Sequence, residues 1–253
     1  MKKFELTAEF VTNVFGKKLF RIKALVAFGD VEKGELGGFI EKEDNLSHDD
    51  NAWVSGDARV SGNAWVSGNA RVSGNAQVSG NAWVSGNARV SGNAQVSGNA
   101  RVSGNARVYG DAWVYGDARV SGNAWVSGNA RVSGNARVYG DAWVSGNARV
   151  SGNAWVYDNA WVSGNARVYG NAQVSGNADY AAVAGFGRYS RTTTFFRCKD
   201  KILRVQCGCF YGDLAQFREI VKKTHGDSKY AKEYLAIADL MELHFSDECG
   251  GEQ

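Results

Sequence analysis

Apolar and polar positions repeat with a period of six residues from Asn51 to Gly176. The repeated phrase is Asn-Ala-(Trp/Arg/Gln)-Val-(Ser/Tyr)-Gly, and it occurs twenty-one times in succession. Ala and Val lie two positions apart, so both side chains lie on one side of an extended segment, while Gly and Asn tolerate the positive φ of a corner. Three segments per turn predict a triangular parallel β-helix with eighteen residues in each coil, and the repeats fill seven coils.

The segments before and within the repeats predict two further features. Residues 1–39 carry no hexapeptides, but strand-forming apolar residues surround a turn at 16–18, which indicates a small N-terminal β cap. Residues 40–184 form the hexapeptide-repeat β-helix. Its first coil is irregular, because Ile40 and Leu46 occupy the Val position six residues apart and Val54 follows only after eight.

The C-terminal segment, residues 185–253, predicts an α+β domain. Residues 192–198 and 202–207 are typical of a β-hairpin, and helices are expected to begin after Asp213 and Ser228, which are good N-cap residues. This domain is expected to close the open end of the β-helix, where the last coil would otherwise expose an unpaired edge. The fold class is therefore dominated by β structure, with a triangular parallel β-helix between a β cap and an α+β domain.

Composition narrows the setting of the protein. The chain has no proline, which fits a ladder in which every coil donates backbone N–H groups. Neither a signal peptide nor a membrane-spanning run is evident, so we expect a soluble, cytoplasmic protein. The four cysteines are clustered late in the chain, which fits a reducing compartment. The net charge of +3 says little about partners.

Several motifs outside the periodic pattern carry a family resemblance. They are Gly34-Glu35-Leu36-Gly37-Gly38-Phe39-Ile40, Asp44-Asn45-Leu46-Ser47-His48, Cys207-Gly208-Cys209-Phe210 and Thr224-His225-Gly226-Asp227. Together with the hexapeptides they make the chain similar to phage and prophage hexapeptide-repeat proteins of largely uncharacterised function. The resemblance implies a left-handed β-helix and a place in the host cytoplasm. Some members are labelled acyltransferases through fold analogy.

Histidine content bears on the enzymatic alternatives. Hexapeptide acyltransferases use a histidine as general base, and γ-class carbonic anhydrases hold a metal with three histidines on the coils. This chain has only His48, His225 and His244, and none lies within the twenty-one hexapeptides. We therefore expect no catalytic residue, no cofactor and no metal. A hexapeptide-type acyltransferase using His48 is the alternative.

Cysteines near the C-terminus leave one metal hypothesis open. Cys198, Cys207, Cys209 and His225 could bind zinc if Cys207 and Cys209 faced one side of a strand, although Cys-X-Cys is not the usual spacing. The favoured interpretation is that these cysteines are small buried apolar residues. Likewise, His225-Gly226-Asp227 fits a helix C-terminus better than a catalytic site.

The position before each Val is expected to point outward. Ten Arg, eight Trp and three Gln occupy it, and these Trp are all the tryptophans of the chain. Residues eighteen apart should stack, so each face carries one run of three arginines. These runs are Arg71, Arg89 and Arg107; Arg131, Arg149 and Arg167; and Arg101, Arg119 and Arg137.

Three interpretations of these outward residues remain. Arginine runs beside tryptophans fit an anionic ligand with flat faces, such as a nucleic acid or nucleotide. A tryptophan run fits a subunit interface of a homo-oligomer, with a trimer favoured. Duplication of eighteen-residue units would produce the same runs without function. The candidate ligand or interface residues are Trp125, Trp143, Trp161, Arg131, Arg149, Arg167, Arg101, Arg119, Arg137, Tyr139 and Tyr157.

The sequence thus favours a non-enzymatic, homo-oligomeric phage or prophage scaffold. Its partner is expected to be a host protein or other host macromolecule, or a nucleic acid or nucleotide ligand, and not a membrane. A role in countering host defence is an extension of this hypothesis. The acyltransferase is the first alternative, and a purely structural spacer is the second.

Overall fold

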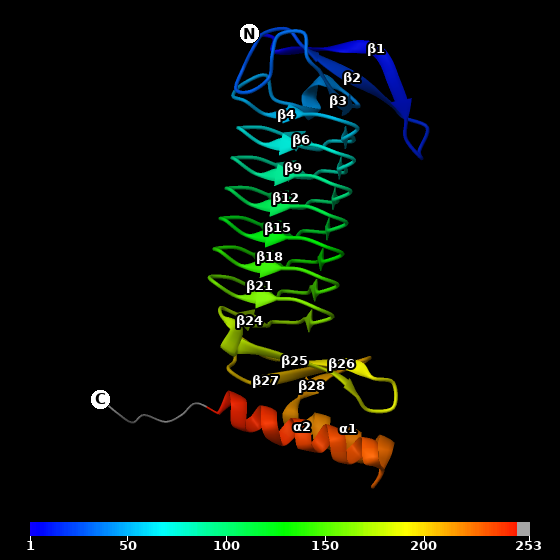
Figure 1. Cartoon of the computed structure of the whole chain (residues 1–253), viewed down its shortest axis with the longest axis vertical. Coiled ribbons are helices and arrows are strands. Elements are labelled where there is room, and N and C mark those ends of the chain that lie inside the picture. The colour runs from blue at the N-terminus through cyan, green and yellow to red at the C-terminus, as the bar shows by residue number, and fades with distance from the viewer. Residues whose placement is uncertain (247–253) are drawn as a thin grey trace, which may run out of the picture.

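The computed structural model describes residues 1–246 as a long shaft with a small β-sheet at one end and a second sheet with two helices at the other (Figure 1). Cys249 lies outside the described residues. Three parallel sheets form the shaft, and every strand pairs with residues eighteen positions away. The triangular parallel β-helix predicted from the hexapeptide period is therefore confirmed.

Each hexapeptide contributes one strand of two residues, the outward residue and Val. We call the three sheets faces 1, 2 and 3. Face 1 contains β4 (Trp53–Val54), β7 (Arg71–Val72), β10 (Arg89–Val90), β13 (Arg107–Val108), β16 (Trp125–Val126), β19 (Trp143–Val144) and β22 (Trp161–Val162). Face 2 contains β5 (Arg59–Val60), β8 (Gln77–Val78), β11 (Gln95–Val96), β14 (Trp113–Val114), β17 (Arg131–Val132), β20 (Arg149–Val150) and β23 (Arg167–Val168). Face 3 contains β6 (Trp65–Val66), β9 (Trp83–Val84), β12 (Arg101–Val102), β15 (Arg119–Val120), β18 (Arg137–Val138), β21 (Trp155–Val156) and β24 (Gln173–Val174).

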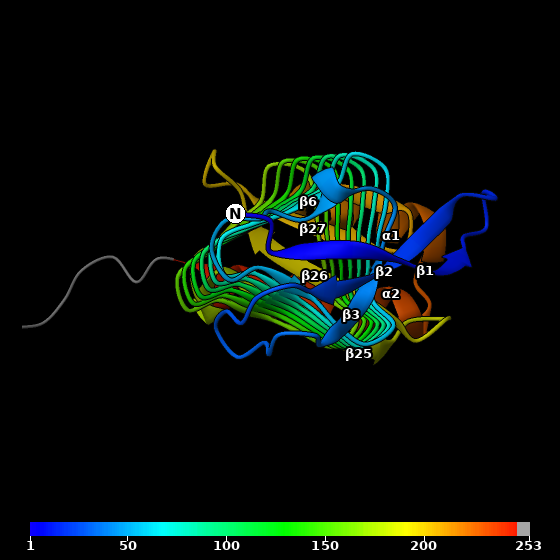
Figure 2. The ribbon, with the colours of Figure 1, turned by 90° about the horizontal axis from the view of Figure 1, so that it is seen from above.

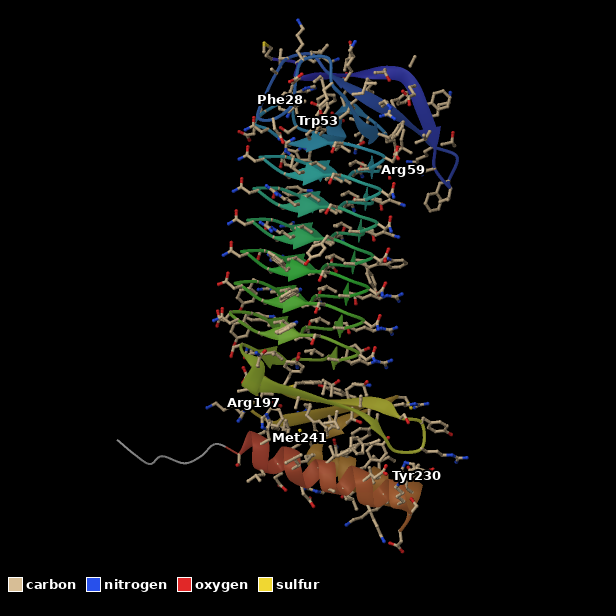
Figure 3. All side chains as sticks on the ribbon, viewed as in Figure 1. Phe28, Trp53, Arg59, Arg197, Tyr230 and Met241 are labelled. Carbon is tan, nitrogen blue, oxygen red and sulfur yellow. The ribbon has the colours of Figure 1, made fainter. Side chains whose placement is uncertain are left out.

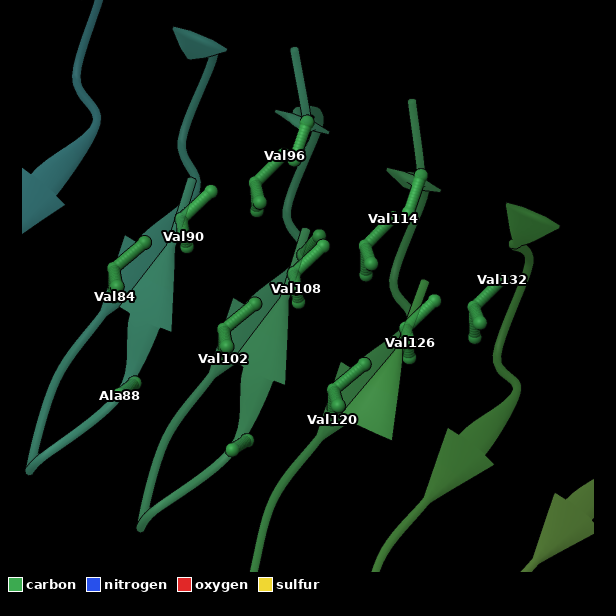
Figure 4. Packing of buried hydrophobic residues seen from close by; sticks show 14 of the residues in the cluster. Val84, Ala88, Val90, Val96, Val102, Val108, Val114, Val120, Val126 and Val132 are labelled. Carbon is green, nitrogen blue, oxygen red and sulfur yellow. The ribbon is translucent and has the colours of Figure 1, made fainter. Parts of the chain in front are cut away.

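The core of the shaft is a column of valines and alanines. Every Val and Ala of the hexapeptides is buried, and the valines of successive coils lie one above another (Figure 4). Backbone hydrogen bonds join the coils, as where Arg89 N–H donates to the Ala106 carbonyl at 2.9 Å. A corner such as Gly104 has φ +66°, and a Cβ there would lie 2.9 Å from the Gly122 nitrogen. Glycine is therefore required at the corners both for conformation and for space.

Asparagine side chains form a second ladder along each corner. Asn81 Nδ2 donates to Asn99 Oδ1 at 3.0 Å, and Asn99 Nδ2 donates to Asp117 Oδ1 at 2.9 Å. A carboxylate cannot donate onward, so this run ends at Asp117, and a new run begins where Asn135 donates to Asn153 at 3.1 Å. The aspartates that replace asparagine thus divide the corner ladders into segments.

The N-terminal cap continues face 2. Strands β1 (Phe4–Thr12), β2 (Lys18–Ala24) and β3 (Leu36–Ile40) pair antiparallel, and β3 then pairs in parallel with β5. Seen along the shaft, this sheet crosses the top coil (Figure 2). Ile40 pairs with Val60 and Leu46 with Val66, so both occupy the valine column as predicted. A short 3₁₀ helix, η1 (Glu43–Asn45), lies between them.

Trp53 corrects the expectation that every residue before Val points into solvent. Its side chain is 1% exposed, because the cap loop places Phe28 edge-on against it at 5.4 Å (Figure 3). Among residues 1–246, the indole N–H finds no hydrogen-bond partner. Gly37 lies against the same ring, since a Cβ there would lie 2.7 Å from Trp53. Trp53 is therefore a core residue of the cap.

The C-terminal unit is an antiparallel sheet covered by two helices. After a 3₁₀ turn, η2 (Asn177–Asp179), come β25 (Tyr180–Phe186), β26 (Arg191–Arg197), β27 (Leu203–Cys207) and β28 (Phe210–Asp213), paired in that order. Helix α1 (Leu214–His225) begins at the predicted cap, where Asp213 accepts from Gln216 N–H at 2.8 Å, and α2 (Lys229–Phe245) begins after Ser228. The predicted hairpin corresponds to β26 and β27. Its flanking strands β25 and β28 were not predicted.

This unit lies directly against the last coil. Phe196 and Cys198 belong to the same buried cluster as the valine column. Arg167 N–H donates to Thr194 Oγ1 at 3.0 Å, and Lys199 N–H donates to the Asn171 carbonyl at 3.2 Å. Backbone groups of the final coil therefore find partners in the C-terminal sheet. Within residues 1–246, no helix is both long and apolar enough to cross a membrane.

Candidate binding surfaces of the solenoid

The three arginine runs are stacked as their spacing predicts. On face 3, Arg119 pairs in register with Arg101 on one side and Arg137 on the other. Face 1 stacks Arg71, Arg89 and Arg107 in the same way, and face 2 stacks Arg131, Arg149 and Arg167. We call these three groups of three residues the arginine ladders. Outward side chains along the shaft stand in such columns (Figure 3).

Tryptophan rings cover four of the six ends of the arginine ladders. On face 3, the Arg101 guanidinium lies 5.2 Å from the Trp83 ring centroid and that of Arg137 lies 4.9 Å from Trp155. The same contact occurs on the other faces, where Arg107 lies over Trp125 at 4.9 Å and Arg131 over Trp113 at 5.0 Å. Cation–π contact thus holds these four terminal arginines against the shaft. The middle arginine of each ladder has another arginine above and below.

The positive charge of the ladders is not balanced by the acids of the repeats. Among residues 1–246, the only ion pair of a repeat arginine joins Arg71 to Asp30 of the N-terminal cap. Burial, followed by the positive charge of Arg89, lowers the pKa of Arg71. Repeat aspartates such as Asp117 accept hydrogen bonds from corner asparagines instead. Apart from Arg71, the ladders are therefore strips of guanidinium groups without an acidic partner among the described residues.

The predicted tryptophan run lies on face 1 of the last coils. Trp125 and Trp143 meet edge-on at 5.5 Å, and Trp143 and Trp161 stack at 5.2 Å with an interplanar angle of 11°. Trp143 and Trp161 are 36% and 48% exposed, and their indole N–H groups donate to Ser127 and Ser145. Serine after Val thus orients the ring of the next coil. The three tryptophans form a continuous, half-exposed aromatic surface, which we call the tryptophan strip.

Tyr139 and Tyr157 form a second aromatic contact beside face 3. Their rings stack at 5.2 Å with an interplanar angle of 8°, and Trp155 lies 6.1 Å from Tyr139. Burial, followed by Tyr157, raises the pKa of Tyr139. Tyr139 and Tyr157 directly follow strands of face 3, and the next corner separates them from Trp143 and Trp161 of face 1. They extend the aromatic surface of face 3.

His48 has structural partners in the cap. Its Nδ1 accepts the Lys3 backbone N–H at 3.1 Å, its ring stacks on Phe4 at 4.2 Å, and its Nε2 lies 3.7 Å from a Glu43 carboxylate oxygen. Both ring nitrogens therefore face groups of the cap. This arrangement orients the N-terminal strand against the first coil.

The cysteines do not adopt the arrangement on which the zinc hypothesis depended. Cys207 ends β27 and pairs with Phe210, so Cys209 lies in the intervening turn and is exposed, rather than sharing a strand face with Cys207. Cys198 is buried beneath the last coil, as predicted for a small apolar residue. The same prediction is wrong for Cys209, whose side chain is exposed. Throughout residues 1–246, no three His, Cys, Asp or Glu side chains gather as metal ligands.

A cavity that sequence reasoning missed lies between face 2 and the C-terminal sheet. Its volume is about 710 Å³, and Arg149 and Arg167 of the shaft line it together with Tyr189, Arg191 and Cys209 of the C-terminal unit. The turn between β25 and β26, which carries Tyr189, lies C-terminal to the last hexapeptide. The six-residue period therefore could not predict that this turn lies beside the shaft.

Comparison with known proteins identifies the repeat. Within the shaft, eleven segments match the family model described as YdcK beta solenoid repeat. They are residues 52–68, 66–80, 76–92, 82–98, 94–110, 100–116, 112–128, 130–146, 142–158, 148–164 and 160–176. No curated protein matches the chain significantly. The match carries neither a phage source nor an acyltransferase label. The shaft of this protein is a β-solenoid whose repeats are similar to the YdcK β-solenoid repeat.

Proposed function

We propose that this β-solenoid is a non-enzymatic, homo-oligomeric scaffold that binds an anionic ligand along its arginine ladders. The observation that carries the proposal is the set of stacked guanidinium groups on all three faces, of which Arg71 alone has an acidic partner among residues 1–246. A shaft that only separated its two ends would be more stable with neutral or alternating charges in these columns.

Electrostatic repulsion within a ladder favours a bound anion. Strands of adjacent coils lie about 4.8 Å apart, and two unit charges at that distance in water repel by about 0.9 kcal/mol. Arg119 has such a neighbour on each side. A ligand with several negative charges replaces this repulsion with attraction and releases counterions. The flanking rings of Trp83 and Trp155 offer flat faces for bases or other aromatic groups.

The tryptophan strip on face 1 supports assembly of several copies. Trp125, Trp143 and Trp161 present contiguous aromatic surface, and large exposed patches of this kind commonly mark subunit contacts. The proposal therefore assigns assembly, with a trimer favoured, to the tryptophan strip, and ligand binding to the arginine ladders. Both functions use side chains in the same outward position of the hexapeptide.

The environment of His48 supports a role without catalysis. A general base needs a ring nitrogen free to accept a substrate proton, whereas His48 Nδ1 accepts the Lys3 N–H and its Nε2 faces Glu43. A phage or prophage source and a role in countering host defence stay proposals that rest on the family resemblance alone.

The proposal is tested by the salt dependence of binding to fluorescein-labelled single-stranded DNA, measured by fluorescence anisotropy. The variant R101Q/R119Q/R137Q removes the face 3 ladder. The control K33Q/K222Q/K223Q removes the same net charge at exposed lysines away from the shaft. We expect the wild type and the control to bind with a steep salt dependence. The ladder variant should lose about 2 units of the slope of log K against log salt concentration, since each phosphate contact contributes about 0.7.

Two outcomes would contradict the proposal. If the wild type does not bind the oligonucleotide at low salt, the ladders do not act as an anion surface. If the ladder variant and the lysine control lose affinity equally, overall charge explains the binding and the stacked arrangement has no role. The purely structural spacer predicts the first of these outcomes.

A further inference from the structure

The seam between the shaft and the C-terminal unit concentrates positive charge in a concave place. The cavity of about 710 Å³ is lined by Arg149 and Arg167 of the face 2 ladder and by Arg191 at the start of β26. Its remaining lining residues are neutral, with Asn147, Asn165 and Thr192 among them. Three guanidinium groups therefore line one cavity, and none of its lining residues within 1–246 is acidic.

Gly208 makes room for Arg191. It has φ +61° in the turn between β27 and β28, and a Cβ at this position would lie 2.5 Å from Arg191 Nη1. The Arg191 guanidinium also lies 4.8 Å from the Tyr189 ring centroid, with Arg188 on the same ring at 5.5 Å. A glycine turn and an aromatic ring thus hold the arginine at the rim of the cavity.

An apolar cavity adjoins the positive one. It has a volume of about 220 Å³ and lies between the sheet and helix α1, lined by Phe210, Phe217, Ile220 and Tyr234 among others. Tyr189, Arg191 and Cys209 line both cavities, so the two share a rim. The apolar lining is rich in aromatic rings, and Phe210 and Phe217 lie 5.6 Å apart.

We propose that this seam binds an organic phosphate that carries an aromatic group, with a nucleotide as the simplest member of the class. The phosphate would lie against Arg149, Arg167 and Arg191, and the aromatic group would cross the rim into the cavity beside Phe210 and Phe217. This inference rests on the proposed function, because two of the three arginines belong to a ladder.

The balance of charge selects phosphate over a single carboxylate. Three arginines without an acid match an anion that carries about two negative charges, which one carboxylate does not supply. The aromatic lining favours a flat ring, because offset or edge-on contact with Phe210 and Phe217 adds to simple burial. Thr224 and His225 also line the apolar cavity and provide polar groups for the edge of such a ring.

The test is isothermal titration calorimetry with AMP, inorganic pyrophosphate, adenosine and dodecanoate. We expect AMP to bind the wild type more tightly than any of the other three, because only AMP combines phosphate with an aromatic ring. R191Q should weaken AMP binding at least about tenfold, since it removes a charged hydrogen-bond donor outside the ladders. K33Q, at an exposed lysine of the N-terminal cap away from both the arginine ladders and the cavity, is the control for lost charge and should leave AMP binding unchanged.

Each contrary result has a distinct meaning. Equal AMP affinity in the wild type and R191Q, or no AMP binding by the wild type, would overturn the site. Pyrophosphate binding as tightly as AMP would remove the apolar cavity from the proposal, and tighter binding of dodecanoate would overturn the aromatic phosphate class. If the ladder proposal alone is wrong, the wild type will not bind DNA, while R191Q will still bind AMP more weakly than the wild type does.

Discussion

Trp53 and Trp143 occupy the same position of the hexapeptide on the same face, yet they should differ sharply in energetic importance. Trp53 is 1% exposed beneath the cap, whereas Trp143 is 36% exposed in β19, the sixth of the seven strands of face 1. We therefore predict that W53A destabilises the N-terminal cap strongly, whereas W143A, its matched control, leaves the cap unchanged.

The magnitude follows from the burial of the indole. Replacing a fully buried tryptophan with alanine costs about 3 to 5 kcal/mol through lost burial and the cavity left behind. W53F keeps most of the volume and removes the indole N–H, which has no hydrogen-bond partner in the part of the chain that the structure describes. Its cost should be below about 1.5 kcal/mol, because the lost contacts are offset by the loss of an unsatisfied polar group.

Native-state hydrogen exchange measures this effect where it should occur. The amides that pair β2 with β3, near Phe20 and Ile40, report the free energy of opening of the cap. W53A should lower it by about 3 to 5 kcal/mol, and amides of the distant coils should be unaffected because stability in a solenoid is local. An equal effect of W53A and W143A on the cap amides would refute the reasoning, as would a W53F variant as unstable as W53A.

Three further predictions concern the asparagine ladder of one corner, the core of the C-terminal unit and the end of the shaft that this unit covers. D117N should raise the melting temperature, by at most about 4 °C in a thermal scan, because asparagine can donate to Asn135 where the carboxylate cannot; an unchanged or lower value would contradict it. Burial, followed by Cys207, raises the pKa of Tyr234 to about 12, so its contribution to stability is complete below the unfolded value near 10 and is lost as the pH rises toward 12. Urea titrations should show that Y234F loses less stability than the wild type across that interval, and equal losses would argue against it. Deleting residues 185–253 should cause aggregation in size-exclusion chromatography, and a soluble fragment that melts cooperatively would count against the capping role.

Periodicity made the shaft predictable in detail. A six-residue phrase with Val and Ala on one side fixes three strands per coil, so Arg119 had to lie between Arg101 and Arg137. The irregular first coil was also accessible, because Ile40 and Leu46 keep the six-residue spacing. Throughout the shaft, the local sequence pattern and the overall fold agree, so the six-residue motif was sufficient to predict the structure of this region.

Side-chain contacts that depend on how the non-repeating segments meet the shaft could not be predicted. Nothing near Trp53 in the sequence distinguishes it from other tryptophans, because its burial depends on a loop that brings Phe28 over the first coil. The same holds for Arg191, whose place beside Arg149 depends on how the C-terminal sheet meets the last coil. Cys209 was misplaced because the turn at Gly208 interrupts the alternation of the strand.

Size-exclusion chromatography with light scattering and ultraviolet absorbance, run at low and high salt, tests the central claim most directly. The account predicts that unmodified protein elutes at an oligomeric mass, trimeric by preference, and that nucleic acid absorbance accompanies it at low salt and disappears at high salt. A monomer free of nucleic acid at both salt concentrations would contradict both the assembly role of the tryptophan strip and the anion-binding role of the arginine ladders.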